Sequence, residues 1–161
     1  MDFYIPADIA NTLSELDEFI EREIMPLQHQ DDNGRFFDHR REDARTDWDR
    51  DGLPNEEWEA LLAQARRLAD QAGHYRYPFP KAYGGRDGTN LGMALIREHL
   101  AAKGLGLHND LQTEHSIVGN NVGLLMMIHY GSEQQKERWI DDLNYVAKEA
   151  DIELPGYTET E

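Results

Sequence analysis

The chain has 161 residues and a formal net charge of −16, with 39% hydrophobic and 30% charged residues and no cysteine. This length fits one domain with a buried core, and the lack of cysteine excludes disulfides, zinc–thiolate sites and thiol nucleophiles. The acidic balance argues against nucleic acid and anionic membranes as partners, and without a signal peptide or a span of ~18 apolar residues we expect a cytoplasmic protein.

The first predicted helix runs from about Pro6 to Gln30. Its apolar residues recur at three- and four-residue steps, which indicates one buried stripe made of Ile9, Leu13, Leu16, Ile20, Ile24 and Leu27. Pro26 lies within this pattern and should kink or end the helix in its last turn. The next segment, 31–51, mixes charges of both signs, and we expect a solvated excursion with one helical turn, tied down by Phe36, Phe37 and Trp48.

A second helix is predicted from Pro54, which suits the first helical position, to a stop at Gly73. Its buried side should comprise Trp58, Leu61, Leu62, Ala65, Leu68, Ala69 and Ala72. A loop with two prolines and three glycines follows at 78–88. Two interpretations stay open for it: a plain connection between helices, or a stiff loop whose bare backbone approaches a ligand or another domain.

The third predicted helix begins at Thr89 or Asn90, continues through Ala102 and ends at Gly104 and Gly106. A fourth is predicted over 117–130, and because 116–128 carries no formal charge we expect a core helix surrounded by others. Its Gly119 and Gly123 would let a neighbouring helix approach closely. Residues 132–135 read Ser-Glu-Gln-Gln, a capping box for a fifth helix that contains Trp139, Ile140 and Leu143.

No alternating strand is evident, so the predicted fold class is all-α. We expect an up-and-down-like bundle of about five helices, with the long mixed-charge loop between the first two main helices. A helical domain over 1–143 would precede an acidic, divergent tail over 144–161.

The chemical motifs are incomplete. Asp47 to Gly52 matches the first six positions of a calcium-binding EF-hand loop, but Trp58 stands where the bidentate glutamate is needed, which favours an acidic turn. The seven histidines show no metal-ligand spacing and are interpreted as core or capping residues. No nucleophile elbow, phosphate loop or dinucleotide-binding motif is present. The residues alone thus predict a helical domain without a self-sufficient active site.

Taken in order, these segments resemble the N-terminal helical domain of the acyl-CoA dehydrogenases. The resemblance rests on the acidic first helix ending near Pro26, the P-x-x-Y-G-G pattern over 80–85, the small-residue-rich apolar segment 116–130, and G-[ST]-x-x-Q-[KR] over 131–136. It covers about residues 5 to 143. The 31–51 excursion is typical of a subgroup with a longer loop.

The resemblance implies an oxidoreductase of fatty acid metabolism, a flavoprotein that oxidises acyl-CoA thioesters between Cα and Cβ. A glutamate from the C-terminal helical part would remove the α-proton, and FAD, held by a middle β-domain and the C-terminal bundle, would accept the hydride. Neither that glutamate nor the T-E-P-x-x-G-S-D entry to the β-domain occurs in this sequence. We therefore expect no catalytic residue, no metal site, no tightly bound FAD and no activity in this chain alone.

The same resemblance implies that the N-terminal domain walls one side of the acyl-thioester pocket. The residues implied to line the pocket are Tyr83, Gly84, Gly85, Leu91, Leu95, Gln112 and Asn120. Gly131, Ser132, Gln135 and Lys136 match motif positions but are interpreted as structural. The alternative is a non-catalytic helical assembly module that pairs with a separate chain supplying the missing domains.

Overall fold

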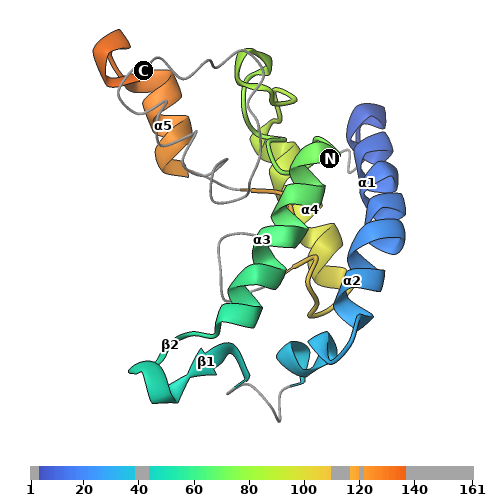
Figure 1. Cartoon of the computed structure of the whole chain (residues 1–161). Coiled ribbons are helices and arrows are strands. Elements are labelled where there is room, and N and C mark those ends of the chain that lie inside the picture. The colour runs from blue at the N-terminus through green and yellow to red at the C-terminus, as the bar shows by residue number, and fades with distance from the viewer. Residues whose placement is uncertain (1–3, 39–43, 110–116, 120–121, 137–161) are drawn as a thin grey trace. The chain divides into compact units, whose positions relative to one another are not determined.

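The computed structural model describes residues 4–38, 44–109, 117–119 and 122–136. Helices dominate these residues, which confirms the predicted all-α class, and one short antiparallel ladder accompanies them. The chain divides into two compact units, Met1–Gly119 and Asn120–Glu161, and each is described by itself (Figure 1). In the described ranges, no helix combines the length and the apolar character needed to cross a membrane.

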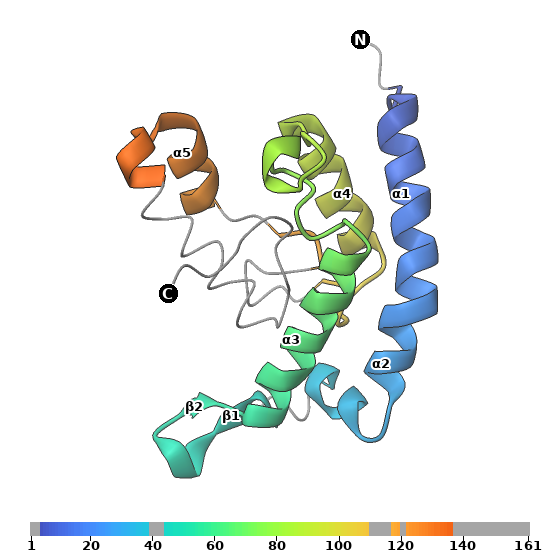
Figure 2. The same ribbon diagram turned by 45° about the horizontal axis from the view of Figure 1, so that its top comes forward.

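The predicted first helix is confirmed, with a change of winding in its middle. Helix α1 (Ala7–Phe19) passes through a π-helical turn, Ile20–Ile24, into α2 (Met25–His29) (Figure 2). The Met25 N–H donates to the Ile20 carbonyl, five residues back. Pro26 has no N–H to continue the α pattern, and the wider turn before it accommodates that loss within a continuous helical path. The buried side comprises Ile9, Leu16, Phe19, Ile20, Ile24 and Leu27. Leu13 of the predicted stripe is only half-buried, and Phe19 is buried although the stripe did not include it.

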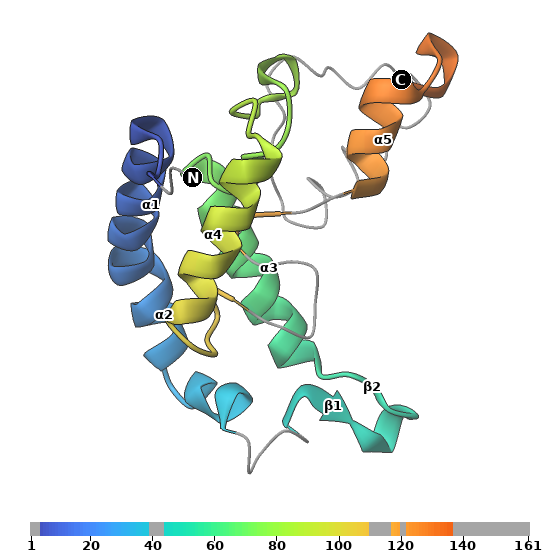
Figure 3. The same ribbon diagram turned by 180° about the vertical axis from the view of Figure 1, so that it is seen from behind.

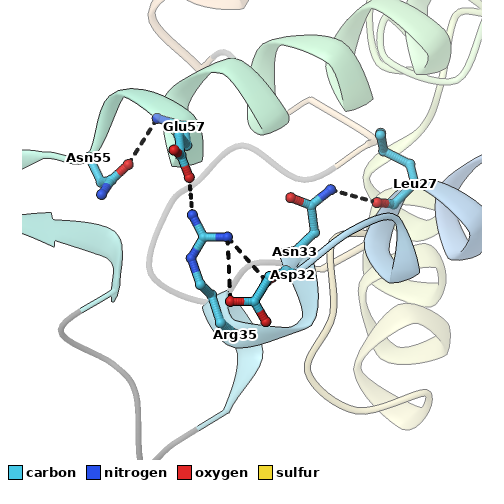
Figure 4. Close-up of polar contacts among 6 residues, drawn as sticks. All are labelled: Leu27, Asp32, Asn33, Arg35, Asn55 and Glu57. Atoms are coloured by element: carbon cyan, nitrogen blue, oxygen red, sulfur yellow. Dashed lines mark hydrogen bonds and ion pairs between the residues drawn. The ribbon is translucent and has the colours of Figure 1, made fainter.

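The segment after α2 makes one 3₁₀ turn, Asn33–Phe37, as the mixed-charge stretch predicted. Phe36 is buried, and its ring lies 5.2 Å from the ring of Trp58 on the next helix. Arg35 forms an ion pair with Glu57, and the Asn33 side-chain amide donates to the Leu27 carbonyl at 3.0 Å (Figure 4). This turn therefore joins the end of α2 to the start of α3 (Glu56–Gln71).

Two expectations for this region are wrong. Trp48 is 70% exposed and anchors nothing in the core; Trp58, on the buried face of α3, takes that place. Pro54 is not the first helical residue, because it pairs with Thr46 in the ladder between β1 (Thr46–Asp47) and β2 (Leu53–Pro54). A residue in a strand has an extended backbone, so the helix begins only after Asn55, whose side chain accepts a hydrogen bond from the Glu57 N–H at 2.9 Å.

The other end of α3 and both ends of α4 (Asn90–Ala102) follow the sequence prediction. Gly73 adopts the left-handed conformation, φ +76°, just past the C-cap of α3. The Thr89 hydroxyl accepts a hydrogen bond from the Gly92 N–H at 3.0 Å, so Thr89 is the N-cap of α4. Gly104, φ +86°, ends the following turn.

Helices α1 and α4 lie beside each other, and polar groups join them (Figure 3). The Asp17 carboxylate of α1 lies 2.6 Å from Nε2 of His99 and 2.9 Å from Nζ of Lys103, both on the α4 side. Burial alone would raise the pKa of Asp17, but the hydrogen bonds from Lys103 and His99 outweigh it and lower the pKa. The core beneath is apolar, with Leu16, Ile96 and Leu100 fully buried.

The uncharged segment after 116 differs from its prediction. Ile117 and Val118 are buried but lie outside any helix, and the Gly119 N–H donates to the Tyr75 carbonyl at 3.0 Å. The described helix in this stretch begins only at Val122. The prediction of one helix starting at Ile117 is therefore wrong.

The second unit contains α5 (Val122–Tyr130). Among the described residues of this unit, no side chain of α5 is buried, and its expected place in a core stays a prediction. The capping box is confirmed, because the Ser132 N–H donates to Gln135 Oε1 at 2.8 Å and the Gln135 N–H donates to Ser132 Oγ at 3.3 Å. Trp139, Ile140 and Leu143 lie outside the described residues.

Candidate functional site

The candidate site is built on the loop 78–88 and the helix that follows it. A 3₁₀ turn, Lys81–Tyr83, opens the loop after Pro80. The Pro80 carbonyl accepts hydrogen bonds from Tyr83 and Gly85 at 2.9 and 3.1 Å. Further on, the Asp87 N–H donates to the Phe79 carbonyl and the Gly88 N–H to the Tyr77 carbonyl, both at 2.9 Å. The end of the loop is thus hydrogen-bonded to the residues at its beginning, Tyr77 and Phe79.

The glycines of this loop face the chain itself. A Cβ on Gly85 would lie 2.6 Å from the Phe79 Cβ, and a Cβ on Gly88 would lie 2.6 Å from the Tyr77 carbonyl oxygen. Both distances are shorter than real Cβ atoms tolerate. Of the two interpretations that the sequence left open, the structure favours a tightly packed connection: the close backbone approach at Gly85 and Gly88 is to this chain's own residues.

Charged side chains hold the loop at both ends. Asp87 accepts a hydrogen bond from the Lys81 N–H at 3.0 Å and pairs with the Lys81 ammonium at 3.3 Å. The backbone hydrogen bond from Lys81 and then its side chain lower the pKa of Asp87. Arg86 donates to Glu15 on α1 at 2.7 Å and to the Ala72 carbonyl at the end of α3 at 3.2 Å. Arg86 thereby ties the loop to two helices.

The expected pocket-lining residues divide by exposure. Tyr83 and Leu95 are half-buried, whereas Leu91 is 55% exposed. Leu91 and Leu95 are four residues apart on α4 and so share one face of that helix. Gly84 takes the left-handed conformation after the 3₁₀ turn, φ +75°. Gln112 and Asn120 lie outside the described residues, and the lining role of all seven stays a prediction.

Two buried histidines, His74 and His108, are in line with the interpretation of the histidines as core residues. His74 is 5% exposed and its ring lies 5.0 Å from the ring of Phe19. Burial, and then the charge of Arg86, lower the pKa of His74 to about 4, so the ring is neutral at pH 7. Burial also lowers the pKa of His108, with the Gly104 and Leu100 carbonyls opposing it. Over the described ranges, no three or more His, Asp or Glu side chains converge as a metal site would require.

The acidic turn 47–52 does not gather its carboxylates around a point. The Asp47 side chain accepts a hydrogen bond from the Asp49 N–H at 3.1 Å and so serves as a local backbone cap. Asp49 and Asp51 are exposed. This arrangement is the acidic turn that the incomplete calcium motif predicted.

The 78–88 loop does not fit the pyrophosphate of a flavin by itself. A pyrophosphate needs bare backbone N–H groups and positive charge, yet the N–H groups of Gly85 and Gly88 are bonded within the loop. Arg86, the cation nearest to them in sequence, is paired with Glu15. The loop therefore offers no cradle of its own for the pyrophosphate of FAD.

Sequence reasoning missed Arg86 and Tyr77. Arg86 forms an ion pair with Glu15, 71 residues away in the sequence, and no local sequence pattern predicts such a pair. The Tyr77 ring packs where Gly88 and Gly92 have no side chain, its Cζ lying 3.0 Å from a Cβ placed on Gly92. Burial raises the pKa of Tyr77. The spacing of Gly88 and Gly92 at the start of a helix could have indicated that something bulky lies over it.

Comparison with known proteins gives one positive finding. Residues 28–145 match the family model of the acyl-CoA dehydrogenase N-terminal domain. The match includes the candidate loop, α4 and α5. No curated protein and no solved structure matches the chain.

Proposed function

Because the chain belongs to the acyl-CoA dehydrogenase family through its N-terminal domain, we propose that it forms the helical wall of an acyl-thioester site in a flavoprotein dehydrogenase. The intact enzyme would oxidise an acyl-CoA between Cα and Cβ with FAD as hydride acceptor. The observation that carries the proposal is the family match over 28–145, which spans the Tyr-Gly-Gly loop and the helix after it.

The role proposed for this chain is positioning rather than chemistry. Leu91 and Leu95 share one face of α4, and that face is incompletely covered by the rest of the described chain. Such a face suits an apolar acyl chain, because burying each methylene is worth ≈ 0.8 kcal/mol. The proton-abstracting glutamate and the flavin would come from a middle β-domain and a C-terminal bundle, in one polypeptide or in a partner chain. In this proposal the 161-residue chain alone catalyses no oxidation.

The first test is the visible spectrum of the purified chain, alone and after addition of FAD followed by gel filtration. We expect no flavin band in either sample and no acyl-CoA-dependent reduction of a dye. A retained flavin band or measurable turnover would show that the proposed division of labour between domains is wrong.

The lining role is tested by Leu95→Trp at the corresponding position of a full-length enzyme of the family. An indole on this face should shorten the preferred acyl chain, with a fall in kcat/KM for long substrates of about tenfold or more, because lost methylene contacts are worth roughly 1–3 kcal/mol. The matched control is Trp at the position of Ala101, which is exposed near the end of the same helix. An unchanged chain-length preference in the Leu95 variant would remove Leu95 from the pocket.

A further inference from the structure

The sequence contains three places where an asparagine or aspartate is followed by glycine: Asn33–Gly34, Asp51–Gly52 and Asp87–Gly88. Such pairs are chemically labile, because glycine has no Cβ to hinder its own backbone nitrogen as it attacks the preceding side-chain carbonyl carbon. The attack closes a five-membered succinimide ring. A folded protein permits this reaction only where the glycine nitrogen is free and the preceding side chain can reach it.

The structure distinguishes the three glycine nitrogens. The Gly52 N–H donates to the Asp47 carbonyl at 3.0 Å, and the Gly88 N–H donates to the Tyr77 carbonyl at 2.9 Å. The Gly34 N–H donates to no group among the described residues, and Gly34 is exposed. A Cβ placed there would meet nothing within 4 Å, so a ring that forms at this position finds open space. Of the three nitrogens, that of Gly34 is the one available for attack.

The side chains that precede these glycines differ in the same sense. Asn33 carries a neutral amide, whose Nδ2 donates to the Leu27 carbonyl at 3.0 Å (Figure 4). This bond is uncharged and only partly buried, so it opens far more often than the slow ring closure occurs. Asp87, in contrast, accepts a hydrogen bond from the Lys81 N–H and pairs with its ammonium group. These contacts lower the pKa of Asp87 and keep it as a carboxylate, which resists nucleophilic attack.

We propose that Asn33 is a site of spontaneous deamidation in the folded protein. The Gly34 nitrogen forms a bond to Cγ of Asn33, the Cγ–Nδ2 bond breaks, and the proton lost by Gly34 leaves with Nδ2 as ammonia. Water then adds to either carbonyl of the succinimide, and the ring opens to aspartate or to isoaspartate. Water is the only other reactant, and no electrons are transferred.

Either product alters the junction between α2 and α3. In aspartate, a carboxylate oxygen replaces the donor and faces the Leu27 carbonyl, at the negative end of the helix dipole. In isoaspartate, the main chain runs through the side chain and gains one methylene just before Arg35 and Phe36. Arg35 pairs with Glu57 at the start of α3, and Phe36 packs on Trp58, so both links would be displaced.

Deamidation at this position would therefore loosen the junction slowly and irreversibly. The chemistry needs neither the acyl-thioester wall nor a flavin, so it is independent of the proposed function.

The test follows the purified full chain in mildly alkaline buffer, folded and unfolded in guanidinium chloride, by mass spectrometry of tryptic peptides. Deamidation at Asn33 appears as a gain of one dalton in the peptide 23–35, split into two peaks for aspartate and isoaspartate. Isomerisation at Asp51 or Asp87 leaves the mass unchanged and adds a second peak. For each site, the ratio of the folded to the unfolded rate removes the intrinsic difference between asparagine and aspartate.

We expect Asn33 to react in the folded chain within about tenfold of its unfolded rate, since one neutral hydrogen bond has to open. Asp51 and Asp87 should react only in the unfolded chain. The matched control is Gly34→Ala, whose Cβ lies in open space, so it should fold as the wild type does and slow ring closure several-fold. Asn33→Asp, which imitates one product, should lower Tm by about 3 °C.

The proposal is overturned if Asn33 stays unmodified in the folded chain while it reacts in the unfolded one, because the Leu27 bond would then protect it. It is also overturned if Asp51 or Asp87 gives a ratio as high as that of Asn33, or if Gly34→Ala reacts as fast as the wild type. An unchanged Tm, both in Asn33→Asp and in the isolated isoaspartate fraction, would refute the effect on the junction.

Discussion

Acidification should destabilise the first unit through His74. The pKa of this histidine is 6.5 in an exposed reference state and about 4 in the folded chain, because burial and then Arg86 disfavour its charged form. Above pH 6.5 both states are neutral and the group contributes no pH dependence. Between pH 6.5 and 4, His74 is protonated in the unfolded chain but still neutral in the folded chain. The free energy of unfolding therefore decreases as the pH is lowered through this range. The full loss is about 3 kcal/mol, at 1.36 kcal/mol for each unit of pKa.

Urea unfolding followed by circular dichroism at a series of pH values measures this loss. The His74→Gln variant keeps a polar side chain that does not titrate, so its free energy of unfolding should fall less steeply over the same range. The difference between the two curves isolates His74 from Asp17 and His108, whose lowered pKa values add acid sensitivity to both proteins alike. Parallel curves for wild type and variant would refute the burial argument.

Further predictions concern packing and a buried ion pair. Gly88→Ala should lower the free energy of unfolding by about 2–4 kcal/mol, because the added Cβ would clash with the Tyr77 carbonyl. A Cβ on Gly34 meets nothing within 4 Å, so the control Gly34→Ala should change the free energy of unfolding by no more than about 0.5 kcal/mol. Thermal unfolding of both variants measures the difference. Arg76→Met should destabilise by roughly 3 kcal/mol, since Arg76 and Asp70 are joined at 2.7 Å with side chains only 14% and 7% exposed. Adding Asp70→Leu to Arg76→Met should restore much of that loss, and a double variant no better than the single one would contradict the assignment of the cost to an unpaired buried carboxylate.

The elements whose signals are local can be predicted well from the sequence. The apolar stripe of α1, the stop at Gly73, the Thr89 cap and the Ser132–Gln135 capping box each depend on residues within four positions of one another. Such short-range rules hold because the interacting groups meet whatever the rest of the chain does. The all-α class follows from them.

The errors arise where a distant segment decides the local conformation. The uncharged run after 116 has the composition of a core helix, yet the Gly119 N–H pairs with Tyr75, and an apolar run alone cannot distinguish these cases. The prediction that Pro54 starts a helix fails because the ladder with Thr46 cannot be read from two-residue strands. Tryptophan is usually well buried, which favours burial of both Trp48 and Trp58; the structure confirms this for Trp58, whereas Trp48 is 70% exposed.

In the candidate site too, local features can be predicted from the sequence, whereas contacts with other segments cannot. The sequence indicates that the glycines of the 78–88 loop permit close backbone approach, but not what approaches, and the structure identifies the approaching groups as Phe79 at Gly85 and Tyr77 at Gly88. It follows that the backbone of this loop is already committed to its own chain. In the proposed function, recognition of an acyl-thioester would have to come from side chains that remain open, Tyr83 on the loop and Leu91 and Leu95 on α4, and the loop's glycines would act by fixing the position of this region. A substitution at Gly85 or Gly88 should therefore alter substrate binding only together with stability, whereas one at Leu95 can alter it alone.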